Sequence, residues 1–174
     1  MGSVSVTHLI GTVSLMLIFF SIGSYYSMSI ASLKNEVITV QLSKISNYIG
    51  SDIVDLVSLC YISELDQLLI KNLTLPAGLT AYGYNMTIKK TTQGIFVRVS
   101  LISESEVYGE YTLPWSTESN IRVYNGSDAG VENYIQSERP YLAPEVQVYS
   151  GDKGIVIWCV KIEDQITIGL GLMS

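Results

Sequence analysis

The chain has 174 residues and a formal net charge of −6 at neutral pH. This length allows one domain of ordinary size plus an appendage, because domains usually run ~100 to 150 residues. The acidic balance argues against a nucleic-acid partner, since phosphate binding needs clustered basic side chains and the only adjacent basic pair is Lys89-Lys90.

The first predicted element is an apolar segment, residues 1–33, in which Gly2 to Leu33 includes no Lys, Arg, Asp or Glu. A bilayer core ~30 Å thick needs about 20 mainly apolar helical residues, so this segment is long enough to cross it. A secretory signal peptide would show a basic start, a shorter apolar core and a small-residue cleavage site, and none of these is clear here. The segment is therefore predicted to be a permanent hydrophobic anchor.

Many small or hydroxylated residues interrupt this apolar segment. Such residues favour helix-on-helix packing in an apolar medium. The positions predicted to pack between helices are Gly11, Ser14, Gly23 and Ser27. The alternative is a lone anchor whose hydroxyl groups bond to the carbonyls of their own helix.

No proline precedes Pro76, so one helix can run from about Val4 to Tyr61 or beyond. After Leu33 the pattern becomes amphipathic, and residues 1–71 are assigned to this helix, with 34–71 as its amphipathic part. One apolar stripe at helical spacing consists of Ile38, Leu42, Ile45, Ile49, Ile53, Leu56 and Cys60. A second row, which continues through Leu65 and Leu68, would widen the buried face near the helix end.

Residues 72–174 are predicted to form a β-rich outer domain. The strand-like runs are 81–91, 95–102, 107–113, 120–124, 145–149, 155–162 and 165–170. Turn residues between them fit a small antiparallel sandwich or curled sheet, with the last three strands as a meander. Residues 115–143 are expected to be an elaborated loop with one strand at most. The predicted fold class is α+β, with the long helix packed on an antiparallel β-sandwich-like domain.

No catalytic, cofactor-binding or metal-binding residues are predicted, and the chain is not expected to be an enzyme. His8 is the only histidine, and it lies in the apolar segment, so a Ser-His-Asp triad would require it to leave that helix. His8 could be a proton-responsive or metal-binding residue; the alternative is a side chain that only packs or lies at the membrane interface.

Three glycosylation sequons begin at Asn72, Asn85 and Asn125. All three follow the helix, in the part that would lie outside the membrane. They are predicted to be exposed, and at least one is predicted to carry a glycan in the native host.

A disulfide is predicted between Cys60, on the apolar stripe, and Cys159, in the most apolar strand. Both would lie on the outer side of the membrane, where oxidised thiols persist, and two cysteines allow one intramolecular pairing. The alternative is a pair of buried free thiols that act as small apolar side chains.

This layout resembles the archaeal type IV pilins and their relatives, the archaellins and the membrane-anchored archaellum accessory proteins. The likeness is in Ser3-Val4-Ser5-Val6-Thr7-His8-Leu9-Ile10 through Ile30, then in Leu73-Thr74-Leu75-Pro76 leading into Tyr82-Gly83-Tyr84. It covers the whole chain as a layout. Bacterial pilins usually have a Glu at the fifth mature position, whereas this sequence has Ser5, which favours an archaeal relative. Either Met1 is the first mature residue, or the protein is an uncleaved, anchored relative.

The resemblance implies a structural subunit of a cell-surface filament, with helices as the core and β-domains as the outer surface. Its partners would be copies of itself, the membrane before assembly and the pilus assembly machinery. The alternative is a membrane-anchored, stator-like accessory protein that binds the surface layer or an archaellum motor. A membrane-anchored enzyme or receptor, the third class, has no residue constellation to support it.

Overall fold

The computed structural model describes residues 2–76, 79, 82–116 and 118–174, and the side chains from His8 onward. Met1, Ala81 and the side chain of Ser5, which the sequence analysis used, lie outside the described residues. The chain divides into two compact units, residues 1–37 and 38–174. Each unit is considered separately.

Helix α1 runs from Gly2 to Ile62, and its first part makes up the first unit. The second part, from Ile38 onward, lies in the core of the second unit. All members of the predicted stripe are buried there: Ile38, Leu42, Ile45, Ile49, Ile53, Leu56 and Cys60. The predicted amphipathic face is therefore confirmed, because a period of 3.6 residues places these side chains along one side of the helix.

The helix ends earlier than the predicted residue 71. It stops at Ile62, and the next element is strand β1, Gln67–Asn72. The proposed second helical row was wrong at its end, since Leu65 is exposed in the turn and Leu68 belongs to the strand. Over so few residues, the spacing of apolar side chains fits a strand as well as a helix. Pairing with β8 decides in favour of the strand.

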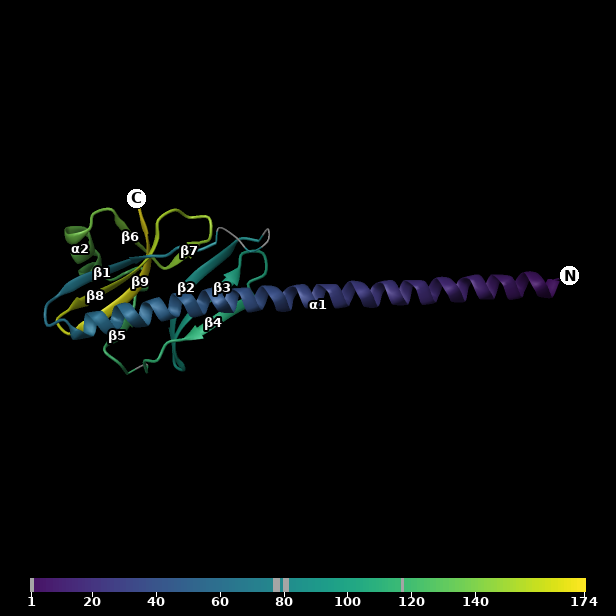
Figure 1. Cartoon of the computed structure of the whole chain (residues 1–174), viewed down its shortest axis with the longest axis horizontal. Helices are drawn as coiled ribbons and strands as arrows, with labels where there is room; N and C mark the ends of the chain where they lie inside the picture. The colour runs from purple at the N-terminus through teal and green to yellow at the C-terminus, as the bar shows by residue number, and fades with distance from the viewer. Residues whose placement is uncertain (1, 77–78, 80–81, 117) are drawn as a thin grey trace. The chain divides into compact units, whose positions relative to one another are not determined.

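Two sheets cover the buried half of α1 (Figure 1). The first, called here the β8–β9 sheet, has the order β1-β8-β9-β5, and β6 also pairs with β9. The second, the β2–β3 sheet, has the order β4-β3-β2-β7. The remaining strands are β2 (Tyr84–Thr91), β3 (Gly94–Leu101), β4 (Tyr108–Thr112), β5 (Ile121–Val123), β6 (Leu142–Glu145), β7 (Gln147–Tyr149), β8 (Ile155–Ile162) and β9 (Gln165–Met173).

The predicted α+β class is confirmed: a long N-terminal helix and two sheets of mainly antiparallel strands. The β5–β9 pair is parallel. The predicted C-terminal meander was wrong, because β7 pairs with β2 while β8 and β9 form a hairpin in the other sheet. The five-residue turn after Tyr149 permits a hairpin but does not require one. In this fold it connects β7 in one sheet to β8 in the other.

The β8–β9 sheet is covered on its second face by helix α2, Ala129–Glu138. Asp128 caps this helix by accepting a hydrogen bond from the Val131 amide, and Val131 and Ile135 pack on the sheet. The predicted loop over 115–143 was therefore wrong in this part. The helix was missed because it has only two buried apolar residues, and because Gly130 near its start is typical of a turn.

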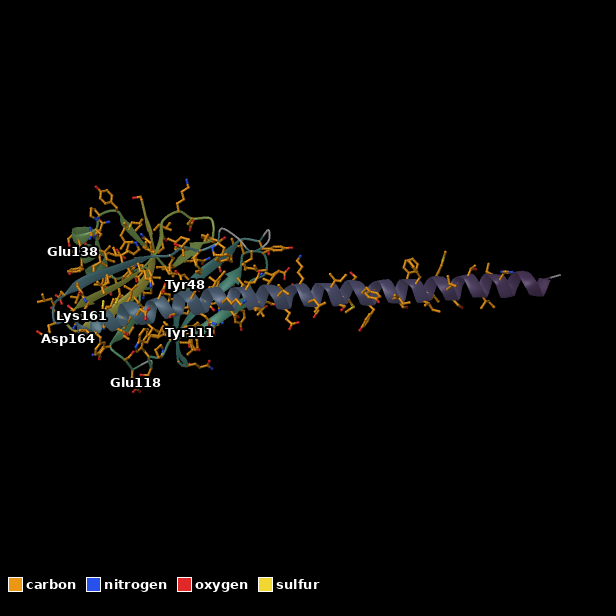
Figure 2. The ribbon with its side chains drawn as sticks, in the orientation of Figure 1. Tyr48, Tyr111, Glu118, Glu138, Lys161 and Asp164 are labelled. Carbon is orange, nitrogen blue, oxygen red and sulfur yellow. The ribbon has the colours of Figure 1, made fainter. Side chains whose placement is uncertain are left out.

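Glycines allow β4 to approach α1 closely. A Cβ at Gly109 would collide with the backbone of Leu42 and Ser43, and a Cβ at Gly50 would collide with the ring of Tyr111. Figure 2 labels Tyr111, which reaches the helix from β4. The β2–β3 sheet therefore packs against the helix backbone itself, at the two places where a side chain is missing.

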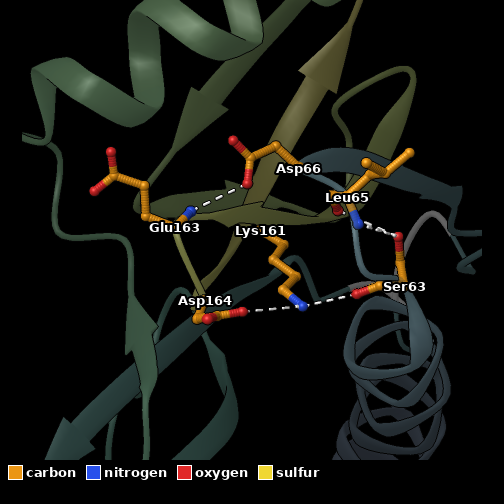
Figure 3. A network of polar contacts seen from close by, with 6 residues as sticks. All are labelled: Ser63, Leu65, Asp66, Lys161, Glu163 and Asp164. Carbon is orange, nitrogen blue, oxygen red and sulfur yellow. Dashed lines mark hydrogen bonds and ion pairs between the residues drawn. The ribbon is translucent and has the colours of Figure 1, made fainter.

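The end of α1 is tied to the β8–β9 hairpin by a polar network (Figure 3). The Lys161 ammonium donates to the Ser63 carbonyl at 2.7 Å and pairs with Asp164 at 3.4 Å. The Glu163 amide donates to the Asp66 carboxylate at 3.1 Å. A basic side chain at the carbonyl end of a helix also interacts favourably with the helix dipole.

Candidate membrane and assembly segment

The candidate functional site is the apolar part of α1, residues 8–33. Its large side chains are exposed all along the helix, and Leu15, Phe19 and Met28 each keep more than 70% of their surface accessible. Figure 2 shows side chains projecting both above and below the ribbon along this part of α1. By length and composition alone, α1 is also the one helix within the described residues that could cross a membrane. An apolar surface of this size needs a cover of lipid or protein.

Two hydroxyl groups in this segment, those of Thr12 and Ser21, are satisfied within the helix. Thr12 donates to the carbonyls of His8 and Leu9 at 2.9 and 3.0 Å, and Ser21 donates to the carbonyl of Leu17 at 2.8 Å. Each such bond lowers the cost of placing a hydroxyl in an apolar medium. Lipid and a neighbouring helix are therefore both acceptable environments for these side chains.

The predicted packing positions, Gly11, Ser14, Gly23 and Ser27, are all exposed. A Cβ at Gly11 or Gly23 would meet nothing within 4 Å. Within the first unit, these four residues therefore lie on the open surface of the helix. Gly23 and Ser27 lie four residues apart, on one face, where another helix could approach closely.

Two of the three sequon asparagines are exposed as predicted. Asn72 lies at the end of β1, and Asn125 lies between β5 and α2. The third expectation was wrong: Asn85 is half-buried within β2 and its side-chain oxygen accepts a hydrogen bond from Ser100 at 2.5 Å. Both flanking strands pair at this residue, so it lies in the middle of a sheet. A sequon motif reports nothing about strand pairing.

The two cysteines lie in contact as free, fully buried thiols. The Cys60 thiol donates to the Cys159 carbonyl at 3.8 Å. The fold thus brings together the predicted pair, 99 positions apart in sequence, while the covalent bond between them stays a prediction.

Sequence reasoning missed an ion pair between α1 and β1. Lys71 donates to the Asp52 carboxylate at 2.7 Å, and this hydrogen bond raises the pKa of Lys71. The second carboxylate oxygen of Asp52 is buried and has no partner. The sequence indicates a buried charge, because Asp52 lies beside Ile53 in the amphipathic part of the helix. Its partner Lys71 can be identified only once the position of β1 is known.

Within the described part of the chain, no three His, Cys, Asp or Glu side chains are grouped so that they could hold a metal ion. His8 is exposed on the apolar segment. No family model, curated protein or solved structure matches the chain. The functional proposal therefore depends on the residues of the chain and on the resemblance of its layout.

Proposed function

We propose that the chain is the structural subunit of an archaeal type IV pilus-like filament on the cell surface. In this proposal the apolar helix segments of many copies form the filament core, and the second units form the outer surface. The observation that carries the proposal is the exposed, uncharged apolar surface of residues 8–33. Copies of the same helix are one cover that such a surface accepts.

Small residues favour a helical partner over lipid alone. The gaps at Gly11 and Gly23 leave room for close approach of another helix, and packing rather than hydrophobicity drives association in an apolar medium. Before assembly the same segment would anchor each subunit in the membrane. Transfer from the membrane to the filament exchanges lipid contacts for helix contacts and would require the pilus assembly machinery.

Substitution of Gly23 tests this proposal. Gly23→Leu adds a branched side chain at an open position, so it should wedge neighbouring helices apart while leaving the isolated subunit unchanged. Ile22→Leu is the matched control, because it retains volume at the adjacent exposed position. We expect sedimentable assemblies from the wild type and the control and few from Gly23→Leu. Equal assembly by all three proteins would contradict the proposed helix contact.

A membrane-anchored accessory protein is the second candidate function. It would stay in the membrane and use its outer unit to bind the surface layer or an archaellum motor. The internally satisfied hydroxyls of Thr12 and Ser21 support this candidate, since they need no neighbouring helix as a hydrogen-bond partner. The distinguishing result is a wild-type protein that stays monomeric in detergent at high concentration and never leaves the membrane fraction.

A further inference from the structure

The cysteine pair lies where the end of α1 meets the β8–β9 sheet. Cys60 is in the last turn of the helix and Cys159 is at the centre of β8, and neither has any exposed surface. The Cys60 thiol donates to the Cys159 carbonyl at 3.8 Å, so its sulfur lies against β8 at this residue. The neighbouring Cys60 thiol and burial raise the pKa of Cys159. Both thiols are thus buried where the helix end meets β8, and the chain has no third thiol.

Neighbouring contacts hold this arrangement in place. Lys161, two residues after Cys159 on β8, donates to the carbonyl of Ser63, three residues after Cys60. The helix end and the strand are therefore fixed together immediately beside the thiols. Cys159 also pairs with Leu69 and Ile168 on both sides of β8, so its position in the sheet is set independently of the helix.

We propose that Cys60 and Cys159 become joined by a disulfide bond while β8 docks on α1, and that the folded unit then shields the bond. The free thiols of the structure are the reduced form of this pair. This inference requires only that the second unit folds in an oxidising compartment, and it does not depend on filament assembly.

The oxidant is a disulfide, either of a thiol–disulfide oxidoreductase or of a small molecule. One cysteine, as its thiolate, attacks the oxidant to form a mixed disulfide and releases one thiol. The second cysteine then attacks the sulfur of the first, forms the internal bond and releases the second thiol. The chain loses two protons and two electrons, and the oxidant is reduced to two thiols.

Burial fixes the order of these events. An oxidant must touch a sulfur atom, and neither sulfur is accessible once the unit has folded. Oxidation is therefore fast only until β8 has docked on α1. A chain that folds reduced should oxidise only through transient opening of the unit, and an oxidised chain should resist reduction for the same reason.

The test compares two routes with the full chain in nonionic detergent. One sample is denatured, reduced and refolded with oxidised glutathione, and the other is refolded in reductant and only then given oxidised glutathione. Thiols are alkylated in denaturant and counted by intact mass. We expect no alkylatable thiol by the first route and two by the second, with oxidation at least ~100-fold slower once the chain is folded.

A Cys60→Ser, Cys159→Ser double variant is the matched control. Oxidation should raise the Tm of the wild type by roughly 10 °C, from a closed loop of about 100 residues, and leave the control unchanged. Two thiols by the first route, or in unreduced native material, would overturn the bond. Equal oxidation rates for the folded and unfolded chain would overturn the shielding.

Discussion

Gly109 is the position where one methyl group should disturb the packing of β4 on α1 most directly. In the Gly109→Ala variant the new Cβ would lie 2.6 Å from the Cα of Ser43 and closer still to other backbone atoms of Leu42 and Ser43. Backbone atoms of a buried helix cannot rotate away as a side chain can. Either β4 or the helix must therefore retreat.

The size of the effect follows from this overlap. The Cβ must move by roughly 1 Å to reach ordinary van der Waals separation. The retreat would open gaps beside Leu42, which has no exposed surface. Overpacking of this kind costs about 1 to 3 kcal/mol, and we expect a value near 3 kcal/mol because the neighbour is backbone.

Guanidinium unfolding of the full chain in detergent, followed by the fluorescence of the buried Trp158, measures this cost. A loss of ~3 kcal/mol should lower the midpoint by roughly 0.5 to 1 M. Gly151→Ala is the matched control, because its Cβ would meet nothing within 4 Å. If Gly109→Ala and Gly151→Ala unfold at the same midpoint, the close approach of β4 to the helix is refuted.

Three further outcomes are expected from the core and its charges. Leu42→Ala should lower the free energy of unfolding by about 2 to 5 kcal/mol in the same assay, because it removes a fully buried side chain; no loss would contradict its place in the core. Lys71→Met should lower the Tm, since it leaves the buried Asp52 carboxylate unpaired, and adding Asp52→Asn should restore most of the loss in a double-mutant cycle. Burial raises the pKa of Tyr84 and of Tyr124 to about 12, so the unfolded chain loses these protons first and stability should fall from about pH 10 to 12. A Tyr84→Phe, Tyr124→Phe variant should show a smaller fall over that range when unfolding midpoints are measured at each pH, and an equal fall would exclude the tyrosines as its cause.

The sequence predicted correctly those elements whose apolar residues form a long, regular local pattern. The stripe from Ile38 to Cys60 repeats over several helical turns, and β8 matches its predicted bounds of 155–162. The apolar segment was equally evident, because a long absence of charge needs no tertiary context. These elements could be predicted because the hydrophobicity of residues close in sequence is enough to define them.

The errors arose where distant residues decide the structure. Leu68 joined β1 because β8 offers a partner strand, and β7 joined the other sheet because β2 pairs with it. Asn85 was predicted to be exposed from its sequon, but it is half-buried in a strand that pairs on both sides. Gly109 gave no signal at all, since its role depends on Leu42 and Ser43, which lie more than sixty positions earlier in the sequence. Long-range pairing of this kind leaves little trace in local composition.

Electron microscopy of material sheared from the surface of native cells tests the filament proposal most directly. The same preparation, separated by sedimentation and identified by peptide mass spectrometry, shows whether this chain is the subunit. We predict filaments composed of this chain, with residues 8–33 of neighbouring copies in contact at the core. Recovery of the chain only from the membrane fraction, as a monomer and with no filaments in the sheared material, would contradict the proposal.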